Sequence, residues 1–281
     1  MIVCIAGLGL IGGSLAIDLR KRGFASSIIG VDNDPQHAAI AQLGGLVDET
    51  DTLENAVKRA DFIILATPVD AIGKLLPQVL DQVGGTQKVV TDMGSTKAGM
   101  GRLVKKHANR RHYVASHPMA GTEFSGPLAA VSKLFDYKCA LICDKEQSAS
   151  FALKIVRKMY KVLNMKIIYM NSDEHDMSAA YVSHISHISS FALSLCVLEK
   201  EKDKKRILSL AGGGFASTVR LAKSSAEMWA PVFEQNSEYV IEVLNTYIDK
   251  LQLFKEHIEK NQRTEVNSLI REANKIQKIL S

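Results

Sequence analysis

A histidine stands at the end of a short apolar run. His117 follows Tyr113 to Ser116, a segment with strand character, and precedes Pro118. Imidazole has an ordinary pKa of about 6.5, so a neutral histidine at this position can take a proton from a hydroxyl near neutral pH. A turn histidine that merely precedes a proline is the alternative, and this segment by itself favours that simpler interpretation.

Polar side chains also occur in two other candidate segments. DMGSTK (Asp92 to Lys97) places Ser95 directly after a strand-like run, and the stretch from Gly212 to Trp229 carries Arg220. A guanidinium can bind a carboxylate in fork geometry and so orient a substrate. Each of these residues could instead be structural: Ser95 as a helix cap, Arg220 in an ion pair with Glu227, and Trp229 as a core residue.

Two histidines lie in a helix-like run, SHISH, from Ser183 to His187. His184 and His187 are three positions apart and therefore neighbours on a helix. They could be core histidines or, together with His175, a metal site. The chain has no H-E-x-x-H pattern, so we expect no metal.

A glycine-rich segment follows the first apolar run, Ile2 to Ala6. Gly7, Gly9 and Gly12 fit the pattern G-x-G-x-x-G, with Leu10 and Ile11 between the last two glycines. The first glycine permits a tight turn, the second lets a pyrophosphate approach the backbone, and the third lets the new helix pack on the strand. Because the amino terminus of a helix attracts phosphate, the pattern predicts a dinucleotide site.

An acidic residue follows the second strand-like run. Asp32 lies 20 residues after Gly12, where a carboxylate can bind ribose hydroxyls and repel a 2′-phosphate. This predicts NAD as the cofactor rather than NADP. Thr67 and Pro68 end a later strand-like run, which predicts that they lie at the cofactor edge of the sheet, although an ordinary strand-to-helix turn explains them equally well.

Short apolar runs alternate with amphipathic segments over the first 170 residues, which predicts βαβ units. We therefore expect an α/β fold, with a Rossmann-type, doubly wound, mostly parallel sheet as an NAD-binding domain (residues 1–170). An all-helical domain for substrate binding and dimerisation follows (residues 171–281). The expected strands are Ile2 to Ala6, Ser27 to Val31, Phe62 to Ala66, Lys88 to Asp92, Tyr113 to Ser116, Lys138 to Cys143 and Lys166 to Met170.

The second part has apolar helical faces but no convincing strand. Tyr181 to Leu198 is apolar almost all round, which predicts a buried helix. Two later faces exceed what one small helical layer can bury, which predicts a homodimer. These faces comprise Val240, Leu244, Tyr247, Leu251 and Phe254, and Val266, Leu269, Ile270, Ala273, Ile276 and Leu280.

Composition indicates an ordinary globular chain of 281 residues with 46% hydrophobic residues, 23% charged residues and a net charge of +5. The mild positive charge suits small anionic ligands and is weak support for nucleic-acid binding, and the run Lys200 to Arg206 is typical of a solvated loop.

Four cysteines without a CxxC pair indicate reduced core residues in a cytoplasmic protein. The amino-terminal apolar run is too short for a signal peptide, and we expect no membrane span.

Several motifs occur together in one order: G-x-G-x-x-G-x-S, D-x-G-S-x-K, S-H-P-x-A-G-x-E, E-H-D followed by S-H-x-x-H, and G-G-G-F…R…M-W. In this order they resemble the prephenate dehydrogenase (TyrA) family of tyrosine biosynthesis, over about Ile2 to Trp229. The resemblance implies oxidation of prephenate by NAD⁺ with loss of carbon dioxide, giving 4-hydroxyphenylpyruvate.

The resemblance also implies roles for individual residues. His117 would accept the ring hydroxyl proton, Ser95 would orient that hydroxyl or the histidine, and Arg220 would hold a substrate carboxylate. The remaining members of the implied substrate site are Ser183, His184, His187, Glu123 at the mouth of the pocket, and Trp229.

The sequence departs from the family pattern after G-G-G-F, where Ala216 and Ser217 replace a common Arg-Asp pair. This leaves open whether the substrate is prephenate or arogenate, as in a cyclohexadienyl dehydrogenase. We also expect no fused mutase or regulatory domain. Two different functions stay open as well: a β-hydroxyacid dehydrogenase with Lys223 as its catalytic lysine, and an NAD-sensing module without turnover.

Overall fold

The computed structural model describes residues 1–203 and 206–280, the last of these without its side chain. By its internal contacts the chain forms two compact units, Met1–Asn236 and Ser237–Ser281. The first unit holds the sheet, all the candidate site residues named above and the helices up to α10. The boundary at residue 170 therefore stays a proposal about domain organisation.

One eight-stranded sheet forms the centre of the first unit, with strand order β3-β2-β1-β4-β5-β6-β7-β8. Neighbouring strands from β3 to β6 are parallel, β7 is antiparallel to β6, and β8 is parallel to β7. This confirms the predicted fold class, and every expected strand is present. The short β3 was not predicted. The strands are β1 (Ile2–Ala6), β2 (Ser27–Val31), β3 (Glu49–Thr50), β4 (Phe62–Leu65), β5 (Val89–Asp92), β6 (Tyr113–Pro118), β7 (Cys139–Cys143) and β8 (Lys166–Met170).

Helices connect the strands and make up the rest of the described chain. The α-helices are α1 (Leu10–Lys21), α2 (Pro35–Leu43), α3 (Leu53–Arg59), α4 (Val69–Gln82), α5 (Ala98–Val104), α6 (Ser150–Val162), α7 (Ser172–Ala179), α8 (Ile185–Asp203), α9 (Gly213–Thr218), α10 (Ala226–Gln235), α11 (Ser237–Glu259), α12 (Arg263–Ala273) and α13 (Gln277–Leu280). A π-helical turn, η4 (Ala180–His184), joins α7 to α8. The 3₁₀ turns are η1 (Arg110–His112), η2 (Pro127–Ala129), η3 (Lys145–Gln147), η5 (Leu208–Leu210), η6 (Arg220–Lys223) and η7 (Asn274–Ile276).

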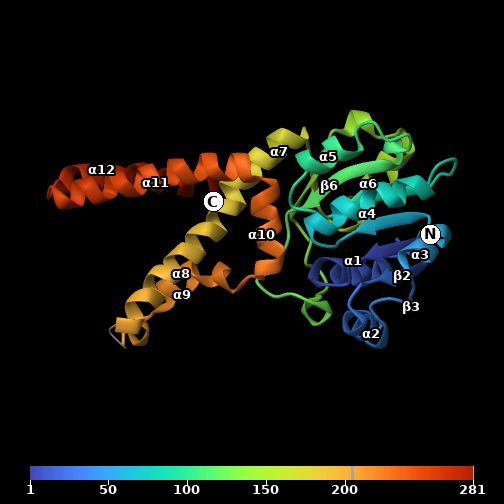
Figure 1. Ribbon diagram of the computed structural model, residues 1–281, viewed down its shortest axis with the longest axis horizontal. Coiled ribbons are helices and arrows are strands. Elements are labelled where there is room, and N and C mark those ends of the chain that lie inside the picture. The colour runs from blue at the N-terminus through green and yellow to red at the C-terminus, as the bar shows by residue number, and fades with distance from the viewer. Residues whose placement is uncertain (204–205, 281) are drawn as a thin grey trace. The chain divides into compact units, whose positions relative to one another are not determined.

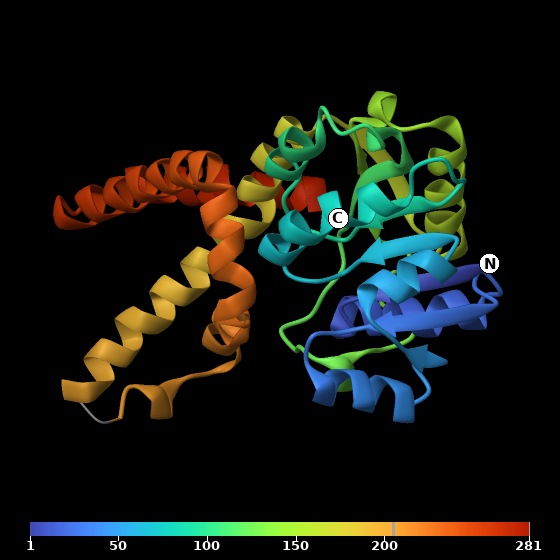
Figure 2. The ribbon, with the colours of Figure 1, turned by 45° about the vertical axis from the view of Figure 1, so that its right-hand side comes forward.

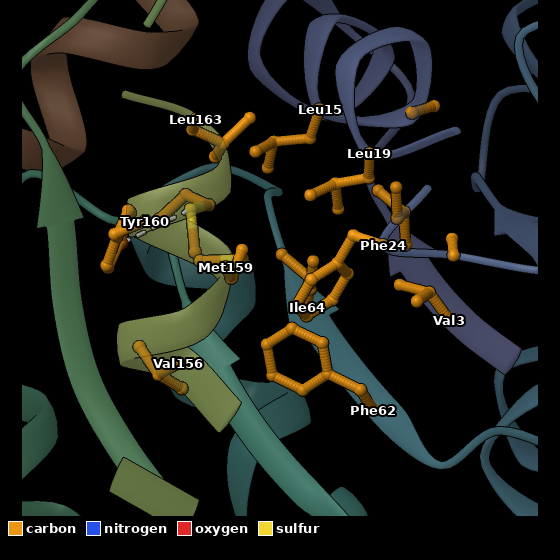
Figure 3. Packing of buried hydrophobic residues seen from close by; sticks show 14 of the residues in the cluster. Val3, Leu15, Leu19, Phe24, Phe62, Ile64, Val156, Met159, Tyr160 and Leu163 are labelled. Carbon is orange, nitrogen blue, oxygen red and sulfur yellow. Dashed lines mark hydrogen bonds between the residues drawn. The ribbon is translucent and has the colours of Figure 1, made fainter. Parts of the chain in front are cut away.

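Helices cover both faces of the sheet (Figure 1). On one face, Leu15 and Leu19 of α1 and Val156 of α6 pack on Phe62 and Ile64 of the central strand β4, as Figure 3 shows. On the other face, α3, α4 and α5 pack on the opposite side chains of the same strands. Because the central strands such as β1 and β4 are buried on both faces, their sequences are continuous apolar runs rather than alternating patterns.

The helix α10 packs on the carboxyl edge of the sheet. Trp229 and Val232 of α10 form a small apolar cluster with Val69, the first residue of α4. Nearby, the Thr96 hydroxyl donates to the side-chain oxygen of Gln235 (2.8 Å). These contacts fix the helical segment beside the strand ends that carry the candidate catalytic residues.

The prediction of a buried helix over Tyr181 to Leu198 is wrong for the single chain. The segment is helical, as η4 followed by α8, but Ser190 is the only residue of α8 that is buried. Figures 1 and 2 agree that α8 extends away from the sheet, so its apolar side chains are at most partly covered within the first unit, and Leu195 and Leu198 are exposed. By length and composition alone, Ser172–Asp203 could cross a membrane, although its first turns are hydrogen-bonded into the first unit.

Two smaller predictions also need correction. The run from Lys200 was expected to be a loop, but α8 continues to Asp203; Lys204 and Lys205 lie outside the described residues. Cysteines were expected in the core, and Cys4 and Cys143 are buried, whereas Cys196 is exposed because it lies on α8. All four cysteines are free.

The second unit contains the two apolar helical faces expected from the sequence, although the last helix is divided. The turn η7 separates α12 from α13, and α12 packs against α11. None of the α12 side chains is buried, and Leu251, Ile258 and Ile270 are more than 40% exposed. The side chain of Leu280, which belongs to the expected face, lies outside the described residues.

Candidate active site

The glycine-rich turn between β1 and α1 has no room for side chains at two of its three positions. Gly7 has φ +93°, and a Cβ there would lie 2.6 Å from the Ala66 carbonyl. A Cβ on Gly12 would lie 1.8 Å from the Gly7 oxygen. At Gly9, which is the N-cap of α1, the space is open, and the helix has no side-chain cap. The free amides of Leu10 and Ile11 can therefore receive a phosphate group, as a dinucleotide site requires.

Asp32 lies at the carboxyl end of β2, beside this turn. Its carboxylate accepts hydrogen bonds from the backbone N–H of Leu8 (2.8 Å) and of Asp34 (3.0 Å). Each carboxylate oxygen keeps acceptor capacity, because it has one protein donor and can take more than one. Asp32 thus shapes the turn and can also accept ribose hydroxyls.

Thr67 and Pro68 lie between β4 and α4, at the same edge of the sheet. Pro68 is the N-cap of α4, and the backbone nitrogen of Thr67 would lie 2.7 Å from a Cβ on Gly7. The Thr67 hydroxyl is buried without a hydrogen-bond partner. An unpaired buried hydroxyl is costly, so its position at this edge is consistent with a ligand contact.

His117 lies on β6 at the same edge, and its ring is held by a hydrogen-bonded chain. Its Nδ1 is 2.9 Å from Nε2 of His175, and Nδ1 of His175 is 2.7 Å from an oxygen of Asp176. Burial, followed by the neighbouring His175, Lys97 and His184, holds the pKa of His117 well below its ordinary value. His117 is therefore neutral at pH 7 and able to act as a base.

A second buried network lies beneath His117. Lys97 and Asp92 form an ion pair, and both residues are 0% exposed. Asp92 also accepts from the Tyr113 hydroxyl (2.6 Å) and from the backbone N–H groups of Gly94 and Ser116 (3.0 and 3.2 Å). This network ties the ends of β5 and β6 together and fixes the turn that carries Ser95.

Ser95 lies in this turn, partly exposed, and is not a helix cap. The N-cap of α5 is Lys97, and Asp176 accepts from the backbone N–H groups of Lys97 (2.7 Å) and Ala98 (2.8 Å). Among the described residues the Ser95 side chain has no hydrogen-bond partner, whereas Nδ1 of His117 pairs with His175. Ser95 is thus free to contact a ligand, and its predicted catalytic role stays a proposal.

His184 is buried with one ring nitrogen unpaired. The Asn236 side-chain amide donates to the backbone oxygen of Asp176 (2.8 Å) and to Nδ1 of His184 (3.0 Å). Burial lowers the pKa of His184 to about 4, so the ring is neutral at pH 7. With Nδ1 as an acceptor, the proton of the neutral ring is on Nε2, which is buried and has no partner. His184 therefore presents an unused hydrogen-bond donor.

His187 and Trp229 form a stacked pair close to His184. Their ring centroids are 3.6 Å apart, and His184 meets the tryptophan edge-on at 5.8 Å. Nδ1 of His187 donates to the backbone oxygen of Ser183 (3.1 Å). The indole N–H of Trp229 is buried and unpaired. The structure thus brings these four predicted residues together, with two unused donors among them.

Arg220 and Glu123 form an ion pair (2.9 Å), with the arginine side chain 51% exposed and the glutamate 17% exposed. The alternative partner, Glu227, instead accepts from the Ser225 hydroxyl. Lys223, the candidate catalytic lysine, is exposed on the same turn as Arg220. Ser217, at the departure from the family pattern, donates to the Gly214 oxygen (2.9 Å) and is exposed.

His175, Asp176, Lys97 and Asp92 were not predicted to belong to the catalytic site. The E-H-D motif was visible in the sequence, but only the structure shows that both its histidine and its second acid are buried against the site.

Of the described residues, no group of three His, Cys, Asp or Glu side chains could hold a metal ion. Both ring nitrogens of His175 already have protein partners.

A doubly wound sheet, a glycine turn that fits a dinucleotide and a neutral histidine at one edge define a nucleotide-dependent dehydrogenase. Comparisons with known proteins give the family. Models described as "Prephenate dehydrogenase, nucleotide-binding domain" and "Prephenate dehydrogenase, dimerization domain" match residues 15–169 and 171–272. The chain belongs to the prephenate dehydrogenase family of NAD-dependent oxidoreductases, as the motif order predicted.

Individual relatives agree with this assignment. A prephenate dehydrogenase from Lactococcus lactis is 30% identical, over 92% of this chain and 69% of that protein. The crystal structure of prephenate dehydrogenase from A. aeolicus in complex with hydroxyphenyl propionate and NAD⁺ covers 100% of this chain and 98% of its own, with 26% identity and a TM-score of 0.86. Synechocystis arogenate dehydrogenase covers 100% of both chains, with 27% identity and a TM-score of 0.76.

Proposed function

We propose that this chain oxidises prephenate with NAD⁺ and releases 4-hydroxyphenylpyruvate, carbon dioxide and NADH. The observation that carries the proposal is the neutral His117 at the carboxyl edge of β6, with Nδ1 paired to His175 and Nε2 left available. The named relatives and the motif order support prephenate as the substrate. The proposed role of the protein is a step of tyrosine biosynthesis in the cytoplasm.

The chain's own residues would orient the ring alcohol and move its proton. Bound NAD⁺ supplies a hydride acceptor. His117 takes the hydroxyl proton as the carbinol carbon loses its hydride and becomes a carbonyl. The ring carboxylate then leaves as carbon dioxide, and the electrons of the broken C–C bond make the ring aromatic. The proton on His117 returns to the resulting phenolate, so the reaction needs no net base.

The unused donors would bind the oxygens of the substrate. We assign Nε2–H of His184 and the indole N–H of Trp229 to substrate oxygens, because both are buried without a partner. Arg220 would bind a carboxylate, with Glu123 beside it. Ser183 and His187 would line the same site, and Ser95 would orient the hydroxyl that His117 deprotonates.

An absorbance assay of NADH and NADPH formation tests the reaction directly. Prephenate and L-arogenate are each supplied with NAD⁺ and with NADP⁺, and we expect the highest kcat/KM for prephenate with NAD⁺. A preference for L-arogenate would favour the second candidate, which the likeness to an arogenate dehydrogenase and Ser217 support. No turnover with any pair would refute the proposal.

Asp32 should set the preference for NAD⁺. Replacing it with alanine removes a charged acceptor, so we expect KM for NAD⁺ to rise about 10- to 100-fold and discrimination against NADP⁺ to fall. Steady-state kinetics with both cofactors measure this. The matched control is Asp34→Ala, which removes the cap of α2 but should leave the ratio of kcat/KM values for the two cofactors unchanged. An unchanged ratio in Asp32→Ala would contradict the assignment.

A homodimer would cover the apolar faces that remain exposed in the single chain. These include Leu195 and Leu198 on α8, which are 67% and 50% exposed, and Ile270 on α12. The description of the second matching family model as a dimerization domain supports this. Light scattering at micromolar concentration should give twice the chain mass of 30.8 kDa, whereas a monomer would refute it.

A further inference from the structure

The hydrogen-bonded chain behind His117 has a defined direction. Asp176 is 1% exposed and His175 is 0% exposed, so water does not compete for their contacts. A carboxylate only accepts hydrogen bonds, so Nδ1 of His175 must carry a proton and donate it to Asp176. When His175 is neutral, its Nε2 is then an acceptor. Nδ1 of His117, 2.9 Å away, must therefore be the donor of that bond.

This direction determines where the lone pair of neutral His117 lies. An imidazole with its proton on Nδ1 has its lone pair on Nε2. We propose that His175 and Asp176 are positioning residues that hold His117 in the tautomer whose Nε2 is the base. The proposal rests on the proposed function, because it explains how one ring nitrogen is kept ready for the substrate hydroxyl.

Asp176 is itself fixed by several other contacts. Its two oxygens accept from the backbone N–H groups of Lys97 and Ala98, at the amino terminus of α5. Its backbone oxygen accepts from Asn236, which also holds His184. These contacts hold the carboxylate facing His175.

The hydrogen bonds from His117 to His175 and from His175 to Asp176 also stabilise the positive charge that His117 acquires when it takes the proton. Protonated His117 still donates through Nδ1 to His175, which in turn donates to the Asp176 carboxylate. The proton from the substrate stays on Nε2 and returns to the product oxygen. His175 and Asp176 thus stabilise the imidazolium without accepting its proton.

Other charged groups face His117 from the surrounding elements. Lys97 lies in the turn before α5, His184 lies in η4, and Asp92 lies behind Lys97 on β5. Burial, Lys97 and His184 oppose protonation of His117, and a charge on His175 would oppose it as well, whereas hydrogen-bond acceptance by neutral His175 favours it. Of two variants that both lack the His175 charge, the one without an acceptor should therefore have the acidic limb of its kcat/KM profile at lower pH.

Two substitutions of His175 separate its two hydrogen bonds. In His175→Gln the side-chain oxygen replaces Nε2 and can still accept from His117, although the link to Asp176 is lost. In His175→Asn the side-chain amide replaces Nδ1 and can still reach Asp176, although the link to His117 is lost. Both variants keep Asp176 and therefore the contacts with α5. His107→Asn, at a partly buried histidine that contacts the exposed Asp81, is the matched control.

We expect kcat to fall about 10²-fold in His175→Asn and about 10-fold in His175→Gln, with little change in KM for prephenate. The acidic limb should lie about half a pH unit or more lower in His175→Asn than in His175→Gln. His107→Asn should behave like the parent. Equal kcat values in the two variants, with coincident acidic limbs, would mean a purely structural role and overturn the proposal.

If the His175 variants do not fold, the tautomer of His117 can be measured directly in the unsubstituted protein. In ¹⁵N-histidine NMR at pH 7.5, the ring signals of His117, assigned by their loss in His117→Asn, should report a protonated Nδ1 and a bare Nε2. The opposite tautomer would overturn the proposal even if prephenate turnover is normal. Conversely, absent turnover with the expected tautomer would refute the proposed function and not the positioning role.

Discussion

The variant His117→Asn should lower kcat for prephenate oxidation by about 10²- to 10⁴-fold, the range that a general base contributes. Asparagine can place an N–H group where Nδ1 of His117 now lies, so the contact with His175 can persist. It cannot accept a proton at neutral pH. NADH formation measures kcat, and fluorescence titration with NADH should give a dissociation constant within a few-fold of the parent value.

The turn that leads into the same strand provides a matched control. His112 lies in η1, directly before the amino end of β6, and its Nδ1 donates to the Lys88 backbone oxygen (2.9 Å). His112→Asn can keep that bond and should retain parent activity. If His117→Asn remained within about threefold of the parent while Lys223→Met lost activity, the β-hydroxyacid dehydrogenase mechanism would replace the one proposed.

Lys97→Met should lower the free energy of unfolding by about 3–5 kcal/mol. The ammonium group is the only side-chain cation paired with Asp92 among the described residues, and both side chains are fully buried. Its loss leaves the carboxylate buried with hydrogen-bond donors but without a compensating charge. Urea denaturation at pH 7 measures the change, and activity should fall as well because the network supports the ends of β5 and β6.

Two further variants show whether the buried charge is the cause. Lys105→Met removes an exposed lysine just after α5 and should change the free energy of unfolding by less than about 0.5 kcal/mol. The double variant Asp92→Asn/Lys97→Met removes both charges and should be more stable than Lys97→Met alone. A single variant with nearly parent stability would show that the ion pair does not stabilise the fold.

The prediction of the sheet succeeded because its signals are local. Buried parallel strands such as Ile2–Ala6 and Phe62–Leu65 are short apolar runs, and the helices between them have their own periodicity. The short β3 carries no such signal, because its two residues are polar and only half-buried. The burial of α8 was predicted wrongly because an apolar helix can be covered by its own chain or by another, and composition does not distinguish the two.

The sequence by itself determined the carboxyl edge and what lies on it. In a parallel sheet the ends of successive strands meet at one edge, so strand positions alone bring the turn at Gly7 and the residues Asp32, Thr67, Ser95 and His117 to that edge. The glycine positions are also local, because Gly7 and Gly12 contact each other within a single turn. These assignments depend on strand order along the chain and not on how the helices pack.

Only the tertiary structure decided what surrounds His117. His175 is 58 positions away from His117 in the sequence and contacts it because α7 packs beside α5. There the Asp176 carboxylate accepts hydrogen bonds from two backbone N–H groups of α5 and its N-cap. The burial of the Lys97–Asp92 pair and the unpaired nitrogen of His184 likewise depend on how the helices enclose the strand ends. Periodicity in the sequence identifies which face of a helix is apolar. The packing between elements decides which distant polar atoms meet. Each such polar atom needs a hydrogen-bond partner, because a buried polar group without one costs free energy.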